Sequence, residues 1–232
     1  MPEGAIIAIG GHEDRVGDRV ILRAVADALG AGPLLILATA SRRPFPYFDL
    51  YRTAFDGIGV HDVRSLDVRT RDDADDPELL DRVSAAGGVF LTGGSQRRLV
   101  DPIRDSRLHQ ALRDLHARGG VLAGTSAGAS ALGECMLAGT EDVRLSDGLG
   151  LLPDMMIDQH FSQRNRIGRL REALTRTTDC NGLGIDEDTA VVVRDGSATV
   201  IGSGQAWMLD RDHPARRFDA GSSFSLGDTI AA

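Results

Sequence analysis

The sequence predicts an α/β fold: a mostly parallel, doubly wound sheet with helices on both faces, followed by a C-terminal antiparallel β meander. Through most of the chain, short apolar runs alternate with segments of helical periodicity, and most of these runs are apolar at every position. Strands that are covered by helices on both faces have this pattern, because every side chain is buried. After residue 184 the runs are short and separated by turn signals, which is typical of a meander.

The expected strands and helices alternate in order along the chain. The expected strands cover residues 5–9, 34–38, 60–66, 88–92, 121–124 and 155–158. The expected helices cover residues 14–29, 47–55, 77–86, 108–117 and 164–175. Pro77 suits a first helical turn, where its missing N–H is not needed, and Ser162 can cap the last helix. The expected meander strands, joined by Asp195-Gly196 and a glycine-rich turn at 202–204, cover residues 188–194, 198–201 and 206–209.

The size and charge of the chain limit the function classes. The 232 residues contain no linker or low-complexity tract, so we expect a single domain, residues 1–232. The formal net charge of -8 argues against general binding of nucleic acid or an anionic membrane, which requires clustered Lys and Arg. No uncharged apolar stretch of about 18 residues and no signal sequence occur, which predicts a cytoplasmic protein. The acidic run at residues 72–76 is interpreted as a solvated loop.

Cys135 and Cys180 are the only cysteines in the sequence. They are far apart and lie outside any spacing that is typical of a metal site. We therefore expect both to be free thiols in the core.

A nucleophile elbow is predicted at residues 121–129, where an apolar run meets Gly-Thr-Ser-Ala-Gly and then helix-forming residues. In such a turn a buried strand breaks sharply into a helix, and the central side chain stands clear of the sheet. Ser126 occupies that centre, and Gly124 and Gly128 lack the Cβ atoms that would clash. The same pattern also fits an ordinary strand-to-helix crossing with a serine at the helix N-terminus. This stretch alone does not decide between the two interpretations.

A serine nucleophile requires a base and a group that orients the base. His160 is the favoured base, because it directly follows an expected strand and functional residues of parallel sheets collect at strand ends. His12, after the first strand, is the alternative. The acid is expected within Asp186-Glu187-Asp188, and the pattern does not choose among the three. The remaining histidines are interpreted as surface or loop residues: His61, His109, His116 and His213.

An oxyanion intermediate requires two hydrogen-bond donors. The backbone N–H of Ala127, which follows the serine, is one candidate. The turn Gly93-Gly94 supplies the other, assigned to Gly94, because glycine lets a backbone approach a substrate closely.

The densest basic cluster follows His160 and consists of Arg164, Arg166 and Arg169. Arg166 and Arg169 share a helical face, whereas Arg164 points elsewhere unless it lies in an irregular first turn. Guanidinium groups bind carboxylates with two parallel hydrogen bonds, so the cluster suits a substrate with free acid groups.

Six segments together resemble the cyanophycinase family, the serine peptidases of type S51, which have a class I glutamine amidotransferase-like fold. The segments cover residues 8–14, 91–96, 124–129, 148–153, 158–170 and 184–190. The resemblance implies that Ser126 is the nucleophile, His160 the base and Glu187 the orienting acid. It also implies a substrate pocket formed by Gln96, Asp158, Gln159, Arg164, Arg166 and Arg169.

The resemblance implies a serine hydrolase that opens β-aspartyl bonds, such as those of cyanophycin or β-Asp-Arg peptides, through an acyl-enzyme and without a metal or cofactor. Cyanophycin is a polyaspartate that carries an arginine on each side-chain carboxyl, and the family suggests a homodimer. The segment 132–147 is shorter than in full cyanophycinases, which favours a β-aspartyl dipeptide or another small peptide as substrate. The alternatives are a non-catalytic peptide- or amino-acid-binding module and a small α-aspartyl dipeptidase. A glutamine amidotransferase is disfavoured, because that chemistry uses cysteine at the elbow.

Overall fold

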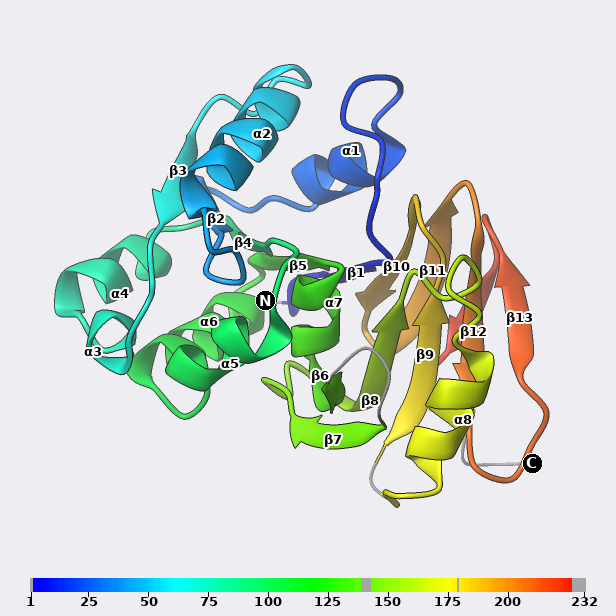
Figure 1. The fold of residues 1–232 in the computed structure, drawn as a ribbon. Coiled ribbons are helices and arrows are strands. Elements are labelled where there is room, and N and C mark those ends of the chain that lie inside the picture. Colours follow the sequence, from blue (N-terminus) through cyan, green and yellow to red (C-terminus); the bar gives the residue numbers. More distant parts are fainter. Residues whose placement is uncertain (1, 139–142, 179, 227–232) are drawn as a thin grey trace.

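The computed structural model describes residues 2–138, 143–178 and 180–226, which form two sheets (Figure 1). The first sheet has the order β14-β11-β10-β1-β5-β4-β2-β3. Its parallel strands are β1 (Ile6–Ile9), β2 (Leu34–Leu37), β3 (Val63–Leu66), β4 (Gly88–Leu91) and β5 (Val121–Thr125). Its antiparallel strands are β10 (Thr189–Arg194), β11 (Ser197–Gly202) and β14 (Ser223–Ser225).

Helices cover both faces of the first sheet. On one face lie α1 (Val20–Asp27) and α2 (Pro44–Asp56). On the other lie α3 (Arg71–Ala74), α4 (Pro77–Ser84), α5 (Gln96–Ile103) and α6 (Arg107–Ala117). Within β1, Ile7 and Ile9 join the core under α1 and α2, while Ile6 and Ala8 join the opposite core. Every residue of β1 is therefore buried, as the continuous apolar run predicts.

The second sheet has the order β13-β12-β9-β8-β6-β7. Its strands are β6 (Gly133–Ala138), β7 (Arg144–Asp147), β8 (Leu152–Gln159), β9 (Asn181–Ile185), β12 (Gln205–Leu209) and β13 (Arg216–Asp219). β8 is parallel to both of its neighbours. α7 (Ala127–Leu132) contacts β5 of the first sheet and β8 of the second, and α8 (Ile167–Leu174) packs on β9. The first sheet thus meets the second around α7.

The fold class is confirmed, with two differences at helix ends. The first helix begins only at Val20, because the preceding chain forms a turn around Asp14. The Asp14 carboxylate accepts hydrogen bonds from the backbone N–H groups of Val16, Gly17 and Arg19. These bonds, led by that from Arg19, lower the pKa of Asp14 to about 2. Ser162 does not cap α8, whose N-cap residue is Arg166; instead, the Ser162 N–H donates to Asp186 Oδ1 at 2.9 Å.

The C-terminal strands are antiparallel, as expected, but they are divided between the sheets. Asp195-Gly196 forms the predicted hairpin between β10 and β11. The turn at 202–204 does not form a second hairpin, because β11 pairs with β14 while β12 pairs with β9. It carries the chain from one sheet to the other.

Two expectations for the middle of the chain are wrong, and one strand occurs where no element was expected. Residues 133–138, to which we assigned no element, form β6, whose hairpin with β7 fills much of the short segment 132–147; residues 139–142 of that segment lie outside the described residues. The acidic run 72–76 includes α3, whose N-cap Thr70 forms a capping box with Asp73. His109 is buried rather than exposed, and its Nε2 lies 2.6 Å from the Leu149 carbonyl oxygen.

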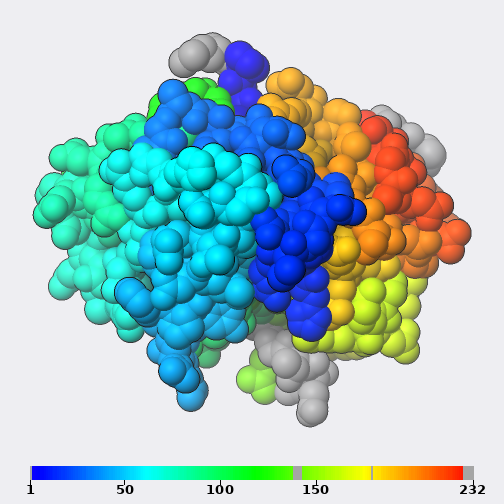
Figure 2. Space-filling model, turned by 90° about the horizontal axis from the view of Figure 1, so that it is seen from above, coloured from blue at the N-terminus to red at the C-terminus, as the bar shows by residue number. Residues whose placement is uncertain are grey.

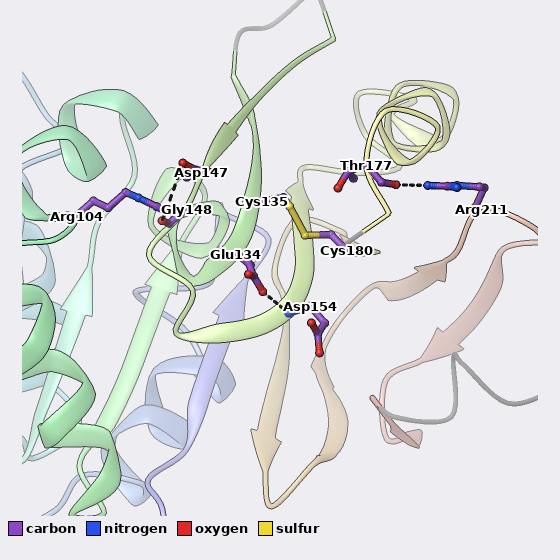
Figure 3. The surroundings of a disulfide bond; sticks show 9 residues. All are labelled: Arg104, Glu134, Cys135, Asp147, Gly148, Asp154, Thr177, Cys180 and Arg211. Atoms are coloured by element: carbon purple, nitrogen blue, oxygen red, sulfur yellow. Dashed lines mark hydrogen bonds and ion pairs between the residues drawn. A yellow bond between two sulfur atoms is a disulfide. The ribbon is translucent and has the colours of Figure 1, made fainter.

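Cys135 and Cys180 form a disulfide, which corrects the expectation of free thiols (Figure 3). Cys135 lies on β6 opposite Met156 of β8, and Cys180 directly precedes Asn181, which lies opposite Met155 of β8. The bond therefore crosses β8 and joins the strands on its two sides. The cytoplasmic location stays a prediction. Within the described ranges, no helix is long and apolar enough to cross a membrane.

The loop after β1 is bonded to the turn that follows β9. Figure 2 shows this deep-blue segment between the cyan part and the yellow and orange C-terminal part. The Asp14 N–H donates to Asp188 Oδ1, and the Asp188 N–H donates to the Gly11 carbonyl oxygen. These bonds hold the end of β1 beside the residues that follow β9.

Candidate active site

The turn between β5 and α7 has the geometry of a nucleophile elbow. Ser126 lies at its centre with φ 52° and ψ -112°, a conformation with positive φ that non-glycine residues rarely adopt. Its N–H donates to the Ile9 carbonyl oxygen at 3.0 Å. A Cβ atom on Gly124 would lie 2.5 Å from the Gly128 carbonyl group, and one on Gly128 would lie 2.2 Å from the Leu91 carbonyl oxygen. Only glycine fits at the positions two residues before and two residues after the serine.

Ser126, His160 and Glu187 form one hydrogen-bonded chain. The Oγ atom of Ser126 lies 3.0 Å from His160 Nε2, and His160 Nδ1 lies 2.6 Å from Glu187 Oε1. Because a carboxylate only accepts, Nδ1 carries the proton and Nε2 is free to accept one from the serine. His160 follows β8, and its N–H donates to the Gly10 carbonyl oxygen at 2.9 Å. The structure thus brings the three predicted residues together, while their catalytic roles stay predictions.

The electrostatics of this chain favour a neutral imidazole beside an ionised acid. Burial lowers the pKa of His160, and the hydrogen bond to Glu187 only partly opposes this. Burial acts to raise the pKa of Glu187, but the hydrogen bond from His160 and the charge of His12 outweigh it, so that its pKa is lowered. The Glu187 backbone N–H donates to Gln163 Oε1 at 3.0 Å, which fixes the turn that carries the acid.

The structure separates the alternatives that the sequence leaves open. His12 contacts the acid rather than the serine: its Nδ1 lies 3.1 Å from Glu187 Oε2. Asp186 accepts from the backbone N–H groups of Ser162 and Gln205, and Asp188 accepts from that of Asp14. Both aspartates therefore hold turns, whereas Glu187 faces His160.

The predicted oxyanion donors lie beside the serine. Gly94 and Ala127 line the same cavity as Ser126. Gly94 has φ 142°, and a Cβ atom on it would lie 2.4 Å from the Ala40 carbonyl oxygen, so this turn requires glycine. A Cβ atom on Gly93 would lie 3.8 Å from Ser126 Oγ. The backbone at Gly93-Gly94 thus approaches the candidate nucleophile closely.

An arginine-lined cavity of about 370 Å³ opens on one side of Ser126. Of the predicted pocket residues, those that line it are Gln96, Gln159, Arg164, Arg166 and Arg169. Arg164 lies in the irregular turn before α8 and therefore reaches the cavity with the other two. Arg97, which no sequence pattern indicated, also lines it.

Asp158 lies behind the cavity wall. It is 1% exposed, and its Oδ1 accepts from Arg166 Nη1 at 2.8 Å and from Arg169 Nη2 at 3.1 Å. Arg166 Nη1 also donates to the Gln159 carbonyl oxygen at 2.7 Å. Asp158 therefore differs from its predicted place in the pocket: it holds two arginines in position rather than facing a ligand.

A second cavity, of about 330 Å³, shares Gly94, Ser126 and Arg164 with the first. His160 and Ser126 line it together with Arg15, Tyr47 and Tyr51, which the sequence analysis did not identify. Glu13 lies behind two of the lining residues. It is 2% exposed and accepts hydrogen bonds from Tyr51 Oη and Thr125 Oγ1. The signal for Glu13 was its position just after β1, where a buried strand reaches the sheet edge.

Comparison with known proteins gives a consistent result. The model of peptidase family S51 matches residues 9–201. A cyanophycinase from Trichormus variabilis is 40% identical over 219 residues, which are 89% of this chain and 73% of that protein. One from Synechococcus elongatus is 41% identical over 220 residues, 90% of this chain and 68% of that protein.

A solved structure has the same fold. It is the crystal structure of a peptidase from an acI-B1 Actinobacterium, with a TM-score of 0.79 and 24% identity, covering 97% of this chain and 98% of that one. This likeness shows the fold alone, whereas the family match and the two cyanophycinases show the family. The chain therefore belongs to peptidase family S51 and is a serine-type peptidase.

Proposed function

We propose that this peptidase hydrolyses peptides containing β-linked aspartyl residues, with cyanophycin as the first candidate, through an acyl-enzyme on Ser126. The observation that carries the proposal is the hydrogen-bonded chain from Ser126 through His160 to Glu187, directly beside an arginine-lined cavity. The names of the cyanophycinases that the chain resembles supply the substrate.

The chemistry follows from the proton positions. As Ser126 Oγ attacks the carbonyl carbon, His160 Nε2 takes its proton, and Glu187 stabilises the resulting imidazolium. The carbonyl oxygen becomes an oxyanion that Ala127 N–H and Gly94 N–H bind. His160 then donates its proton to the leaving nitrogen. Water, activated by the same imidazole, releases the acid and restores the serine.

The arginine-lined cavity suits the free carboxylates of such a substrate. In cyanophycin the arginine on each aspartyl side chain leaves a free α-carboxylate. Guanidinium groups bind carboxylates with charge-assisted hydrogen bonds, and Arg166 is fixed by Asp158 and the Gln159 carbonyl oxygen before any ligand arrives. A fixed guanidinium loses little conformational freedom on binding, which favours affinity.

The experiment is an assay of the purified chain against cyanophycin, β-Asp-Arg and α-Asp-Arg, with the products identified by mass. We expect release of products from at least one of the two β-linked substrates, no such release by Ser126→Ala, and an unchanged circular dichroism spectrum for that variant. The matched control is Ser130→Ala, in the same helix turn but bonded to the Ile157 carbonyl oxygen. Cleavage of α-Asp-Arg alone, or full activity of Ser126→Ala, would overturn the proposal.

A serine-reactive sulfonyl fluoride separates a peptidase from a binding module. We expect one label on Ser126 and none on Ser126→Ala. The predicted homodimer is a separate question, which light scattering after size-exclusion chromatography answers.

A further inference from the structure

One carboxylate in this site contacts two imidazole rings. Glu187 Oε1 lies 2.6 Å from His160 Nδ1, and Glu187 Oε2 lies 3.1 Å from His12 Nδ1. The two rings are 5.1 Å apart between centroids and nearly perpendicular. The three residues come from the loops after β1, β8 and β9, so the fold brings together ligand atoms that are distant in sequence.

The serine chemistry does not account for His12. Its side chain is 68% exposed, it does not bond to Ser126, and the triad acid already has His160 as its partner. Its backbone has φ 52°, a positive value that is uncommon for residues other than glycine and costs energy. An exposed imidazole is nevertheless held at the second carboxylate oxygen of Glu187.

We propose that His12, His160 and Glu187 form an inhibitory site for a divalent transition-metal cation, with Zn²⁺ as the first candidate. Two imidazole nitrogens and one carboxylate oxygen are the donor set of many three-ligand zinc sites, in which water or another group takes the fourth position. The ligand atoms here all lie within 4.8 Å of one another. Ligands about 2.0–2.2 Å from a tetrahedral zinc ion lie about 3.4 Å apart, so small side-chain movements bring the three atoms to that spacing.

Metal at this position stops the serine chemistry through the histidine tautomer. Zinc requires the lone pair of His160 Nδ1, which carries a proton in the free enzyme. The neutral ring keeps that one proton by moving it to Nε2, so no proton is gained or lost overall. An Nε2–H group cannot accept the proton of Ser126, and the hydrogen bond from Nδ1 to Glu187 is replaced by two bonds to the metal. The nucleophile thereby loses its base.

The exposure of the site determines whether an ion reaches it, and the surrounding charges determine how tightly the ion binds. His12 is exposed and lines the cavity of about 330 Å³ beside the serine, so an ion reaches the set without unfolding of the loops. The carboxylate of Glu187 attracts a cation. Arg164, whose positive charge acts on His160, opposes a dication, so we expect reversible binding that is weaker than at a closed structural zinc site.

The experiment measures binding and activity separately. Isothermal titration of the chelator-treated chain with ZnCl₂ is expected to show one ion per chain, and CoCl₂ to give the visible absorption of a tetrahedral complex. His12→Ala should weaken zinc binding at least about tenfold, since loss of a direct ligand costs no less than loss of a residue that supports one. The matched control is His61→Ala, which removes an equally exposed histidine that pairs with Asp56.

Activity is then compared within each variant, with and without zinc. In the wild-type chain and in His61→Ala, zinc should inhibit and a chelator should restore turnover, whereas His12→Ala should need at least about tenfold more zinc for the same inhibition. Absence of binding to the wild type, or equal binding by His12→Ala, would overturn the proposal. The titration needs no substrate, so failure of the metal site and failure of the proposed function are distinguishable.

Discussion

Gly11 lies directly against the imidazole ring of His160. A Cβ atom on Gly11 would be 2.5 Å from Cε1 and 2.8 Å from Nε2 of that ring, and the residue has φ +96°, which side chains disfavour. The neighbouring carbonyl groups are also engaged, since that of Gly10 accepts from His160 N–H and that of Gly11 accepts from Asp188 N–H. The turn after β1 is therefore one wall of the site that positions the candidate base.

Gly11→Ala tests this wall. The added methyl group must displace the imidazole from Ser126, and a misplacement of about 1 Å costs about 100-fold in rate. We expect kcat/KM to fall by about that factor. The control is Gly168→Ala in α8, where an added Cβ meets no atom within 4 Å. Equal activity of the two variants would show that Gly11 does not hold the ring.

Much of the site could be predicted because it lies where strands end. Ser126 and His160 directly follow apolar runs, and parallel strands place their carboxyl ends at one edge. The choice of Glu187 over Asp186 and Asp188 required the family resemblance, because three adjacent carboxyl groups differ only in how the turn directs them. The structure separates them by their backbone partners.

The features that the sequence did not predict depend on contacts between distant segments. The pairing of Cys135 with Cys180 requires β6 and β9 to lie on either side of β8, and β6 itself carries no clear periodicity. The burial of His109 depends on the Leu149 carbonyl oxygen, 40 residues away. Local patterns contain no information on such partners.

Asp158→Asn tests the support of the arginines. Both partners of the pair with Arg166 are buried, and loss of one charge leaves the other without compensation. We expect the free energy of unfolding to fall by about 3–5 kcal/mol and KM to rise more than kcat falls, because the guanidinium groups lose their fixed position. Denaturant titration and kinetics provide the two measurements.

The control for Asp158 is Glu172→Gln, which removes one partner of an exposed ion pair with Arg176. Exposed pairs contribute at most about 1 kcal/mol, so this variant should remain close to the wild type in stability and KM. If both variants lost the same stability with no change in KM, Asp158 would have no role in positioning the arginines.

Removal of the disulfide should destabilise the second sheet. Cys135 and Cys180 are 45 residues apart, and closing a loop of that length restricts the unfolded chain by about 4 kcal/mol. We expect the Cys135→Ala/Cys180→Ala double variant to lose about 2–4 kcal/mol of unfolding free energy. A reducing agent should destabilise the wild-type chain and leave the double variant unchanged. The same midpoint for the wild type with and without reductant would contradict the role of the bond.

His109 makes the stability depend on pH. Its Nδ1 accepts from Asp105 N–H and its Nε2 donates to the Leu149 carbonyl oxygen, so the folded state holds the neutral ring. Burial lowers its pKa below the ordinary value of 6.5, although the bond to Leu149 partly opposes this. The unfolded chain therefore takes up the proton first as the pH falls, and the stability contributed by His109 is present above about pH 6.5 and lost below it.

The measurement is the free energy of unfolding at about pH 7 and about pH 5. The wild-type chain should be less stable at the lower pH, and His109→Gln should reduce this difference, because a glutamine amide can both donate and accept without titrating. His61→Gln is the matched control, since that histidine is exposed and should leave the difference between the two pH values unchanged. If His109→Gln retained the full difference, protonation at His109 would not be its source, and the buried ring would contribute only through its hydrogen bonds.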